Sequence, residues 1–552
     1  MWFLILGLVS FCLAANNTGL DPVDNFCRIW YHQSVVKNNA LYIDGGLEVF
    51  TPSSNASASN KTTGYNTYLV KLDLTDSWDW KTNISLETIE KTKSSQTGTA
   101  APLLVRGALY SGPTNDSQFY LYGGSVSTQN TSFPGWQSPS SPQYSLWSYD
   151  TSNQDWSQYD TSLDVPNRPN NGAFAEAPDL GLAFYHNGQI DEGSSPALEK
   201  ESSFRAFLPG LVVIDTKTQI VRNYSTDAVP DSPRSRHGGV YIAGVGEKGI
   251  FVTVGGVTKS VDDSSSKNKG SLISMEYIDI LDVSSLSTSN GTWYRQKASG
   301  DIPSSRLDFC LVAVSAADNS SHNIYMYGGR DFSTDYDELY ILSLPSFKWI
   351  KVWQGESPRW GHTCHVVGKS QLLTVGGADD GNFTRGCDWE TKMVGVYDLS
   401  RGTWGSVYKS YDDAYQVPRT VFREVGGDAT GGATTTQPDG GFDSKDTAQL
   451  FGSSGTSSSK GISGGAIAGA VIGSVAGAAI LAGLAFFFFR RKKTIPAQQT
   501  QLSDEDKKAD GKPRHYPIFE SPGSNPAVEL GENNVRHEMD PSPKASRFME
   551  LP

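Results

Sequence analysis

The side chains of this 552-residue chain that could do chemistry are few and scattered. Six histidines precede residue 464: His32, His186, His237, His322, His362 and His365. Three of them, His32, His237 and His362, recur at one place before an apolar run, and a repeated position of this kind is usually structural. His362 and His365 are three residues apart, so on a strand they face opposite ways and do not indicate a zinc site. With no nucleophile elbow, paired-carboxylate motif or P-loop, the sequence predicts no catalytic residue, metal or cofactor.

The cysteines are also few. Cys12 lies in an apolar leader, which leaves Cys27, Cys310, Cys364 and Cys387. In an oxidising compartment these four thiols allow at most two disulfides. Cys364 and Cys387 flank one glycine pair, so we predict a disulfide between them rather than metal or redox chemistry. Whether Cys310 pairs with Cys27 stays open.

An internal repeat must position these residues. Apolar runs end in a glycine pair five times, at Gly45 and Gly46, Gly123 and Gly124, Gly255 and Gly256, Gly328 and Gly329, and Gly376 and Gly377. An apolar strand follows each pair, and then usually a strand with tryptophan, as at Trp156, Trp293, Trp349 and Trp404. The glycines can turn the chain where a Cβ would clash, and the large indole can fill the space between neighbouring sheets.

Three of the runs follow a Pro/Arg loop: SPRSRH at 232–237, IPSSR at 302–306 and SPRWGH at 357–362. Gly-Gly, then Tyr-Asp, then Trp, after such a loop, resembles the kelch motif, which implies a β-propeller of four-stranded blades. RWGHTCHVVGKSQLLTVGG with CDWETKMVGVYDLSRGTW resembles the last blade of fungal membrane-anchored kelch-repeat proteins of the galactose oxidase/kelch superfamily.

We therefore expect an all-β fold with six blades, at roughly 27–80, 100–160, 180–224, 237–295, 306–350 and 360–408. The third blade is degenerate, because LGLAFYHNG stands where the glycine pair should be. Residues 415–427 could add a closing strand to the first blade, since closure removes exposed strand edges.

The resemblance leaves three functions open, one of them a structural wall-associated protein without a specific ligand. The superfamily includes copper radical oxidases, whose sites need two His, two Tyr and a Cys that crosslinks to one Tyr, so a surface-anchored oxidase-like enzyme is the alternative. Propellers host many functions, and the leading expectation is a recognition or adhesion protein without enzymatic activity.

Two apolar segments predict the topology. Residues 1–15 are typical of a signal peptide, and 464–489 of a transmembrane helix, followed by the cationic cluster RRKK at 490–493. This charge places the disordered tail, 490–552, in the cytoplasm and the propeller, 16–427, outside the cell at the plasma membrane. Between them, 428–463 reads as a flexible Gly/Ser/Thr-rich linker. Glycines at every fourth position of the helix could pair two helices into a homodimer.

Glycosylation sequons agree with that topology, because all precede the predicted helix. They lie at Asn16, Asn55, Asn60, Asn83, Asn115, Asn130, Asn223, Asn290, Asn319 and Asn382.

The expected partners follow from charge and loops. The net charge of −13 disfavours nucleic acid. A protein or glycan ligand outside the cell and a cytoplasmic partner of the tail are expected instead. Long crossings after the glycine pairs are suited to recognition. Those of the third and fourth blades carry no sequon, so we predict binding there, with Asp191, Glu192, Phe204, Asp262 and Asp263 as candidates; the alternative is that these loops are disordered insertions.

Overall fold

The computed structural model describes residues 21–51, 61–126, 145–161, 168–198, 200–201, 203–379, 386–411 and 413–452. The chain divides into two compact units, 1–457 and 458–552, and all described residues belong to the first. Predicted segments 1–15 and 464–489 lie outside the described residues. Within the described part, no helix is long and apolar enough to cross a membrane.

The fold is nearly all β. Five sheets have four strands and one has five, and the strands of each pair antiparallel in chain order, with one added parallel strand, β26 (Ser299–Gly300). The first two sheets are β2 (Gln33–Lys37), β3 (Ala40–Asp44), β6 (Tyr68–Asp73), β8 (Leu86–Glu90), and β9 (Ala108–Tyr110), β10 (Gln118–Tyr122), β11 (Leu146–Asp150), β12 (Asp155–Tyr159). The third and fourth are β13 (Ala173–Ala177), β14 (Leu182–His186), β17 (Leu211–Asp215), β18 (Ile220–Tyr224), and β20 (Gly238–Ile242), β21 (Ile250–Val254), β24 (Tyr277–Asp282), β25 (Thr292–Lys297). The last two are β27 (Cys310–Ser315), β28 (His322–Tyr327), β29 (Glu338–Leu344), β30 (Lys348–Gln354), and β31 (Thr363–Val367), β32 (Gln371–Val375), β33 (Val394–Asp398), β34 (Thr403–Gly405).

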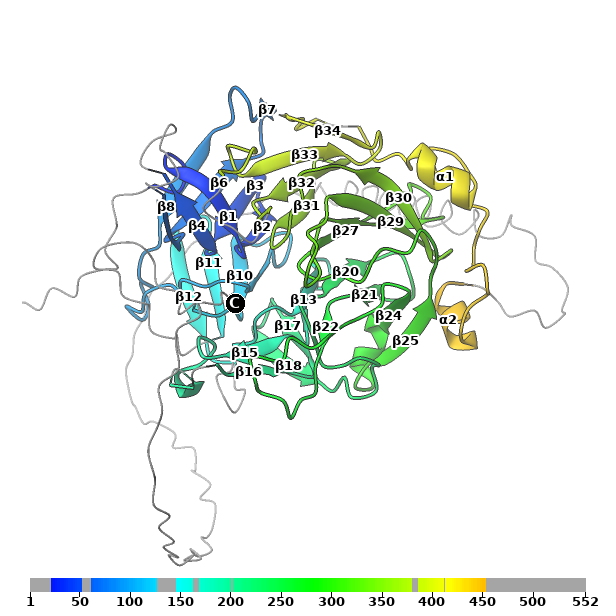
Figure 1. Ribbon diagram of the computed structural model, residues 1–552, viewed down its shortest axis with the longest axis horizontal. Coiled ribbons are helices and arrows are strands. Elements are labelled where there is room, and N and C mark those ends of the chain that lie inside the picture. Colours follow the sequence, from blue (N-terminus) through cyan, green and yellow to red (C-terminus); the bar gives the residue numbers. More distant parts are fainter. Residues whose placement is uncertain are drawn as a thin grey trace, which may run out of the picture. The chain divides into compact units, whose positions relative to one another are not determined.

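The six sheets stand in a ring. Their first strands contact one another in the order β2, β9, β13, β20, β27, β31 and back to β2, and these inner strands surround a common centre (Figure 1). Six apolar clusters form the core, one between each pair of neighbouring sheets. Because successive side chains of a strand point to opposite faces, each sheet contributes side chains to the apolar clusters on both of its sides. Both of its faces are therefore apolar.

The glycine pairs hold neighbouring sheets together. Both glycines of all five pairs have positive φ, between 56° and 110°. The third sheet has Asn187 and Gly188 instead, at φ 53° and 102°, and asparagine is among the few other residues that tolerate this conformation. The N–H of the second glycine donates to a backbone carbonyl before the next sheet: Gly46 to Leu104, Gly124 to Pro169, Gly188 to Arg234, Gly256 to Arg306, Gly329 to Arg359 and Gly377 to Ile29, all at 2.7–2.9 Å. The sixth bond returns to the first sheet and closes the ring.

The motif tryptophans lie on outer strands and pack toward a neighbouring sheet. Trp156 and Trp349 are fully buried, and Trp349 Nε1 donates to the carbonyl of Met275, which precedes β24 in the fourth sheet, at 3.0 Å. Trp293 packs against His186 of the third sheet and Trp404 against Tyr327 of the fifth. In the first sheet no tryptophan stands on the outer strand β8, and Trp78 lies before it in β7 (Trp78–Asp79).

Short strands cover the end of the ring where the second strand of each sheet crosses to the third. They are β1 (Phe26–Trp30), β4 (Leu47–Phe50) and β5 (Thr62–Tyr65), β15 (Gln189–Asp191) and β16 (Arg205–Phe207), and β19 (Arg234–Ser235), β22 (Val257–Thr258) and β23 (Ser271–Leu272). Short 3₁₀ helices occur at Pro196–Leu198 and Val283–Ser287.

The predicted closing strand at 415–427 is wrong. That segment contains helix α1 (Arg419–Val425), which contacts β29 and β30 of the fifth sheet. The first and last sheets are instead joined where β35 (Val407–Tyr408) pairs with β7. Each four-stranded sheet is continuous in sequence, so no strand is exchanged between the chain ends.

The predicted linker boundary at 427/428 also differs from the structure. Residues 428–452 pack on the fourth and fifth sheets and include helix α2 (Lys445–Leu450). Phe442 and Phe451 stack on each other and lie edge-on to Phe347, while Asp443 accepts a hydrogen bond from the Lys297 N–H at 2.7 Å. The polar composition concealed the widely spaced aromatic side chains that bind this segment to the ring.

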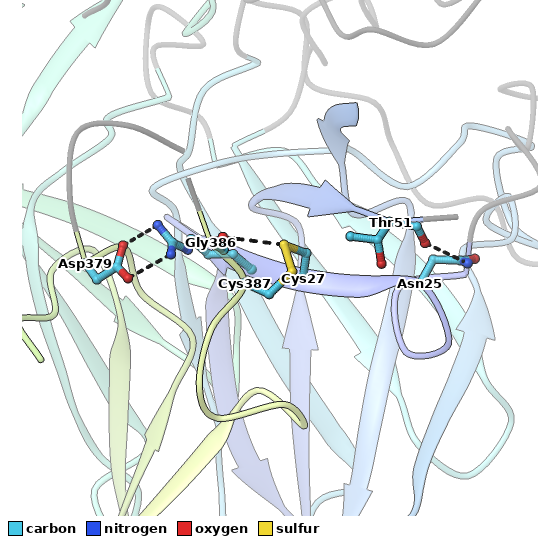
Figure 2. Close-up of a disulfide and its surroundings, with 7 residues drawn as sticks. Asn25, Cys27, Thr51, Asp379, Gly386 and Cys387 are labelled. Atoms are coloured by element: carbon cyan, nitrogen blue, oxygen red, sulfur yellow. Dashed lines mark hydrogen bonds and ion pairs between the residues drawn. A yellow bond between two sulfur atoms is a disulfide. The ribbon is translucent and has the colours of Figure 1, made fainter. Parts of the chain in front are cut away.

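The predicted Cys364–Cys387 disulfide is wrong. The structure pairs Cys27 with Cys387 and Cys310 with Cys364, with Cα–Cα distances of 4.4 and 5.9 Å. Cys364 lies on inner strand β31 beside β27, which begins at Cys310, whereas Cys387 lies in the crossing next to β1 (Figure 2). The short separation in sequence favoured the wrong pair. Closure of the ring brings Cys387 to Cys27 and Cys364 to Cys310, whereas the segment between Cys364 and Cys387 does not bring those two residues together.

Candidate binding site at the hub of the ring

Six residues with left-handed backbone conformation surround the centre of the ring. Each lies two positions before an inner strand: Tyr31, Arg106, Asn171, Arg236, Asp308 and Gly361, with φ of 55–64°. We call these six residues the hub. A left-handed conformation costs a non-glycine residue about 1–2 kcal/mol, so the surrounding structure must impose it.

Backbone hydrogen bonds impose the hub conformation. The N–H groups donate in a closed circle: Tyr31 to Gly361 (2.8 Å), Gly361 to Asp308 (2.9 Å), Asp308 to Arg236 (3.1 Å), Arg236 to Asn171 (2.7 Å), Asn171 to Arg106 (3.1 Å) and Arg106 to Tyr31 (2.8 Å). Every bond joins neighbouring sheets, so six residues from distant parts of the sequence, five of them with side chains, gather around one point.

The hub and the crossings lie at the same end of the ring. An inner strand starts at the hub end, and its antiparallel partner returns there. The crossing from second to third strand therefore emerges at the hub, whereas the turns joining first to second and third to fourth strands lie at the opposite end. Side chains of the hub and of the crossings can thus contribute to one binding surface.

Charged side chains of the hub contact one another. The Arg106 guanidinium lies 3.9 Å from the centre of the Tyr31 ring. Tyr31 Oη donates to Asp308 Oδ2 at 3.3 Å, and Arg236 Nη1 lies 3.7 Å from the same oxygen. The Tyr31 hydroxyl and the Arg236 guanidinium thus share the Asp308 carboxylate.

A third arginine, Arg205, joins them from strand β16 of the third crossing. Burial lowers the pKa of Arg205 to about 10, with further lowering by the nearby cations Arg236 and Arg106. For Arg236, burial also lowers the pKa, but Asp308 and Tyr31 together outweigh burial, so that the pKa of Arg236 is raised. The arrangement concentrates positive charge in a chain whose net charge is −13, which suits it to bind an anionic group.

The predicted loop residues are ordered and belong to two crossings that pair with each other. Phe204 forms a β-bridge with Ser265, and the Arg205 N–H donates to the Ser264 carbonyl at 2.8 Å. The Lys259 ammonium donates to the Arg205 carbonyl at 2.7 Å. The disordered alternative therefore does not hold for the described residues of these crossings.

The acidic candidates have different surroundings. Asp191 is internal to the fold, because Ser125 Oγ, Asn170 Nδ2 and the Gly193 N–H donate to its carboxylate. Asp263 accepts from the Ser265 N–H within its own loop, and Asp262 is exposed at the surface. Glu192 Oε2 accepts from the Ser203 N–H.

Sequence reasoning missed Tyr31, Arg106, Arg205 and Asp308. Arg236 lies in the Pro/Arg loop SPRSRH at 232–237, but the motif gave no indication that this side chain lies at the centre of the ring. Alignment of the six repeats on the residue two positions before each inner strand would have revealed the hub. Arg205 has no such signal, because it does not occupy a position of the repeat: it lies in the β15–β16 pair of the third crossing.

The histidines of the repeat occupy the contacts between sheets. His32 Nε2 bonds to Thr363 Oγ1 at 3.1 Å, and His237 Nε2 to His186 Nδ1 at 2.9 Å. His365 bonds to Ser34 of the first sheet at 2.7 Å, whereas His362 packs against Tyr327 of the fifth. No group of three or more His, Cys, Asp or Glu suited to a metal occurs among the described residues.

The cysteines do not fit a copper radical site. Such a site needs a cysteine free to crosslink with tyrosine, and all four cysteines of the described region are paired in disulfides. The four paired cysteines therefore do not supply the free thiol that the oxidase alternative requires.

The ring of repeated four-stranded sheets, held by glycine pairs and interleaved tryptophans, has the architecture of a β-propeller, and its repeat resembles the kelch motif. The chain is similar to a Kelch repeat-containing protein of the fungus Arthroderma benhamiae, with 29% identity over 480 residues, 76% of this chain and 65% of that protein. This confirms the resemblance to kelch-repeat proteins predicted from the motifs.

A second relative is more distant. Host cell factor of Drosophila melanogaster is 30% identical over 172 residues, 30% of this chain and 11% of that protein. No protein-family model matches the chain. The matches span 65% or less of each relative's length, so they support the repeat architecture and not the activity of a whole protein.

Proposed function

We propose that this chain is a six-bladed kelch propeller that recognises a protein or glycan outside the cell and is anchored to the plasma membrane. The ring of six sheets and the kelch relatives support an interaction module rather than an enzyme. A signal peptide at 1–15, a membrane helix at 464–489 and a cytoplasmic tail at 490–552 complete the proposal.

The main observation in support of a binding role is that the third and fourth crossings are hydrogen-bonded to each other beside the hub. We call the described residues of 189–207 and 257–272 the joined loops. Ser266 N–H donates to the Ser203 carbonyl, and Lys259 Nζ reaches the carbonyls of Arg205 and Ser265. Long loops fixed on a rigid scaffold are where recognition usually resides.

Glycans would leave this arc uncovered. Of the sequon asparagines that are described, Asn83, Asn115, Asn290 and Asn319 are exposed in turns opposite the hub, and Asn223 is exposed on outer strand β18. Asn55, Asn60, Asn130 and Asn382 belong to the first, second and sixth crossings and lie outside the described residues, as does Asn16. The third and fourth crossings contain no sequon.

The test compares two matched surface variants of the full-length chain. Val261→Ser with Lys267→Ala alters exposed positions of the joined loops, and Ile220→Ser with Arg222→Ala alters exposed positions of β18. Capture from a cell-surface extract and a glycan array are both measured. The proposal expects ligands to be lost only in the first variant, and equal capture by both variants contradicts it.

The topology has a separate test. Treatment of the cell-expressed chain with an endoglycosidase should reduce its apparent mass, and protease added to intact cells should remove the propeller but spare an epitope placed in 490–552. Protection of the propeller in intact cells contradicts the proposed orientation.

A further inference from the structure

The hub contains more positive charge than the described residues neutralise. Arg106 makes no ion pair or hydrogen bond through its guanidinium within the described region, and its buried Nε has no partner. Arg205 Nε is buried and unpartnered in the same way. Arg236 has one ion pair, at 3.7 Å to Asp308.

The nearby carboxylates are already engaged. Asp308 accepts from Tyr31 Oη and is shared with Arg236. Asp191, opposite Arg205 in the β15–β16 pair, is held by Ser125 Oγ at 2.6 Å and Asn170 Nδ2 at 3.1 Å. Partly buried guanidinium groups that lack partners carry a desolvation cost, which an added anion would offset.

The contrast with other buried arginines of the ring is instructive. Arg234, Arg306 and Arg359 each lie two positions before a hub residue, and each has a carboxylate partner at 2.6–2.9 Å: Asp279, Glu338 and Asp388. The fold thus pairs these structural arginines closely, whereas Arg106 and Arg205 have no carboxylate partner among the described residues and Arg236 has only the longer ion pair, 3.7 Å to Asp308.

We propose that Arg106, Arg205 and Arg236 form a site for a carboxylate presented by an acidic protein segment. This inference rests on the proposed function and names the chemistry of its partner. Guanidinium groups match a carboxylate in shape and can donate two parallel hydrogen bonds to it.

Three observations favour a protein segment over an acidic glycan. The Tyr31 ring is covered by Arg106 at 3.9 Å and packs on Trp360 at 5.6 Å, so it offers no free face for a sugar ring to stack on. None of the exposed large apolar side chains of the described residues belongs to the hub. The net charge of −13 also opposes a polyanion, so a ligand with one or two carboxylates is preferred.

The experiment measures binding of three probes to the full-length chain by calorimetry. The probes are an acetylated, amidated peptide with two glutamates, the same peptide with glutamines, and a uronic-acid oligosaccharide, each at up to about 10 mM, a range that detects millimolar affinity. We expect only the glutamate peptide to bind.

Variants identify the site. Arg205→Gln and Arg236→Gln should each weaken binding of the glutamate peptide at least about tenfold, as loss of one charge-assisted hydrogen bond implies. Arg401→Gln is the matched control, because this 69%-exposed side chain lies in a turn opposite the hub. Arg205 makes no side-chain hydrogen bond in the described part, so its substitution leaves folding intact, and unchanged thermal unfolding verifies this.

Several results overturn the inference: no binding of the glutamate peptide, equal binding of the glutamine peptide, unchanged affinity in Arg205→Gln, or equal loss in Arg401→Gln. Binding of the oligosaccharide without the peptide overturns the assignment to a protein segment. If ligands captured through the joined loops bind Arg205→Gln normally, the carboxylate site is wrong while the proposed recognition function stands.

Discussion

At the scale of single residues, the second glycine of each pair has a role that no larger side chain can fill. A Cβ on Gly256 would lie 2.6 Å from both His237 Cβ and the Ser235 carbonyl, at φ 84°. We expect Gly256→Ala to lower the free energy of unfolding by about 2–4 kcal/mol, from overpacking and backbone strain together.

The control for this substitution is Gly405→Ala. Gly405 has open space around its Cβ position and no positive φ. Urea denaturation should show a change within about 0.5 kcal/mol for the control. Similar losses in both variants would contradict the assigned role of the glycine pair.

Buried histidines make stability depend on pH. Burial lowers the pKa of His32 to about 3 and of His322 to about 4, whereas the unfolded value is about 6.5. The unfolded chain therefore binds more protons between these values, so each histidine's contribution is complete above pH 6.5 and is lost as the pH falls toward 4.

A buried carboxyl acts in the opposite direction. Burial raises the pKa of Glu176 to about 7, so its contribution is present below about pH 4.5 and is lost as the pH rises to 7. Between pH 7 and 4.5, the free energy of unfolding should fall less steeply with decreasing pH in His322→Gln than in the wild type, and more steeply in Glu176→Gln. Chemical denaturation at each pH measures it. Parallel pH profiles for wild type and both variants would contradict these pKa shifts.

At the scale of elements, the segment 428–452 behaves as part of the propeller. Phe451 packs between Phe442 and Phe347, so Phe451→Ala should lower stability by about 1–2 kcal/mol, less than a fully buried phenylalanine because the side chain is partly exposed. Trypsin should then cleave faster after Lys445, in helix α2.

Gln449→Ala is the control for this prediction, since Gln449 is exposed on the same helix. Timed proteolysis with mass spectrometry measures the cleavage rate after Lys445. Rapid cleavage after Lys445 in the wild type would contradict this packing and would support the flexible linker predicted from composition.

At the scale of the whole molecule, ring closure depends on bonds between the chain ends. The Cys27–Cys387 disulfide spans 360 residues and Cys310–Cys364 spans 54. Since loop-closure entropy grows with the logarithm of loop length, the longer bridge should stabilise by about 2 kcal/mol more.

Chemical denaturation compares two double variants. One carries Cys27→Ser and Cys387→Ser, and the other carries Cys310→Ser and Cys364→Ser. The first pair should be the less stable. A greater loss in the second pair would show that local packing of β27 on β31 outweighs closure of the ring.

The sequence by itself determined the repeat and therefore the class of fold. Glycine pairs, alternating apolar runs and tryptophans are local patterns with local causes, so they predicted nearly all-β structure and six sheets at almost the right positions. Even the degenerate third repeat forms a sheet, because Asn187 adopts the backbone conformation that glycine has elsewhere.

Only the tertiary structure decided which distant residues meet. The disulfide partners, the join between β35 and β7, and the hub depend on closure of the ring, which brings Tyr31 beside Asp308 and Arg106. No local pattern encodes these contacts, since each hub residue comes from a different repeat. The candidate site therefore emerged from the geometry of closure, whereas the repeats that build it were readable in the sequence.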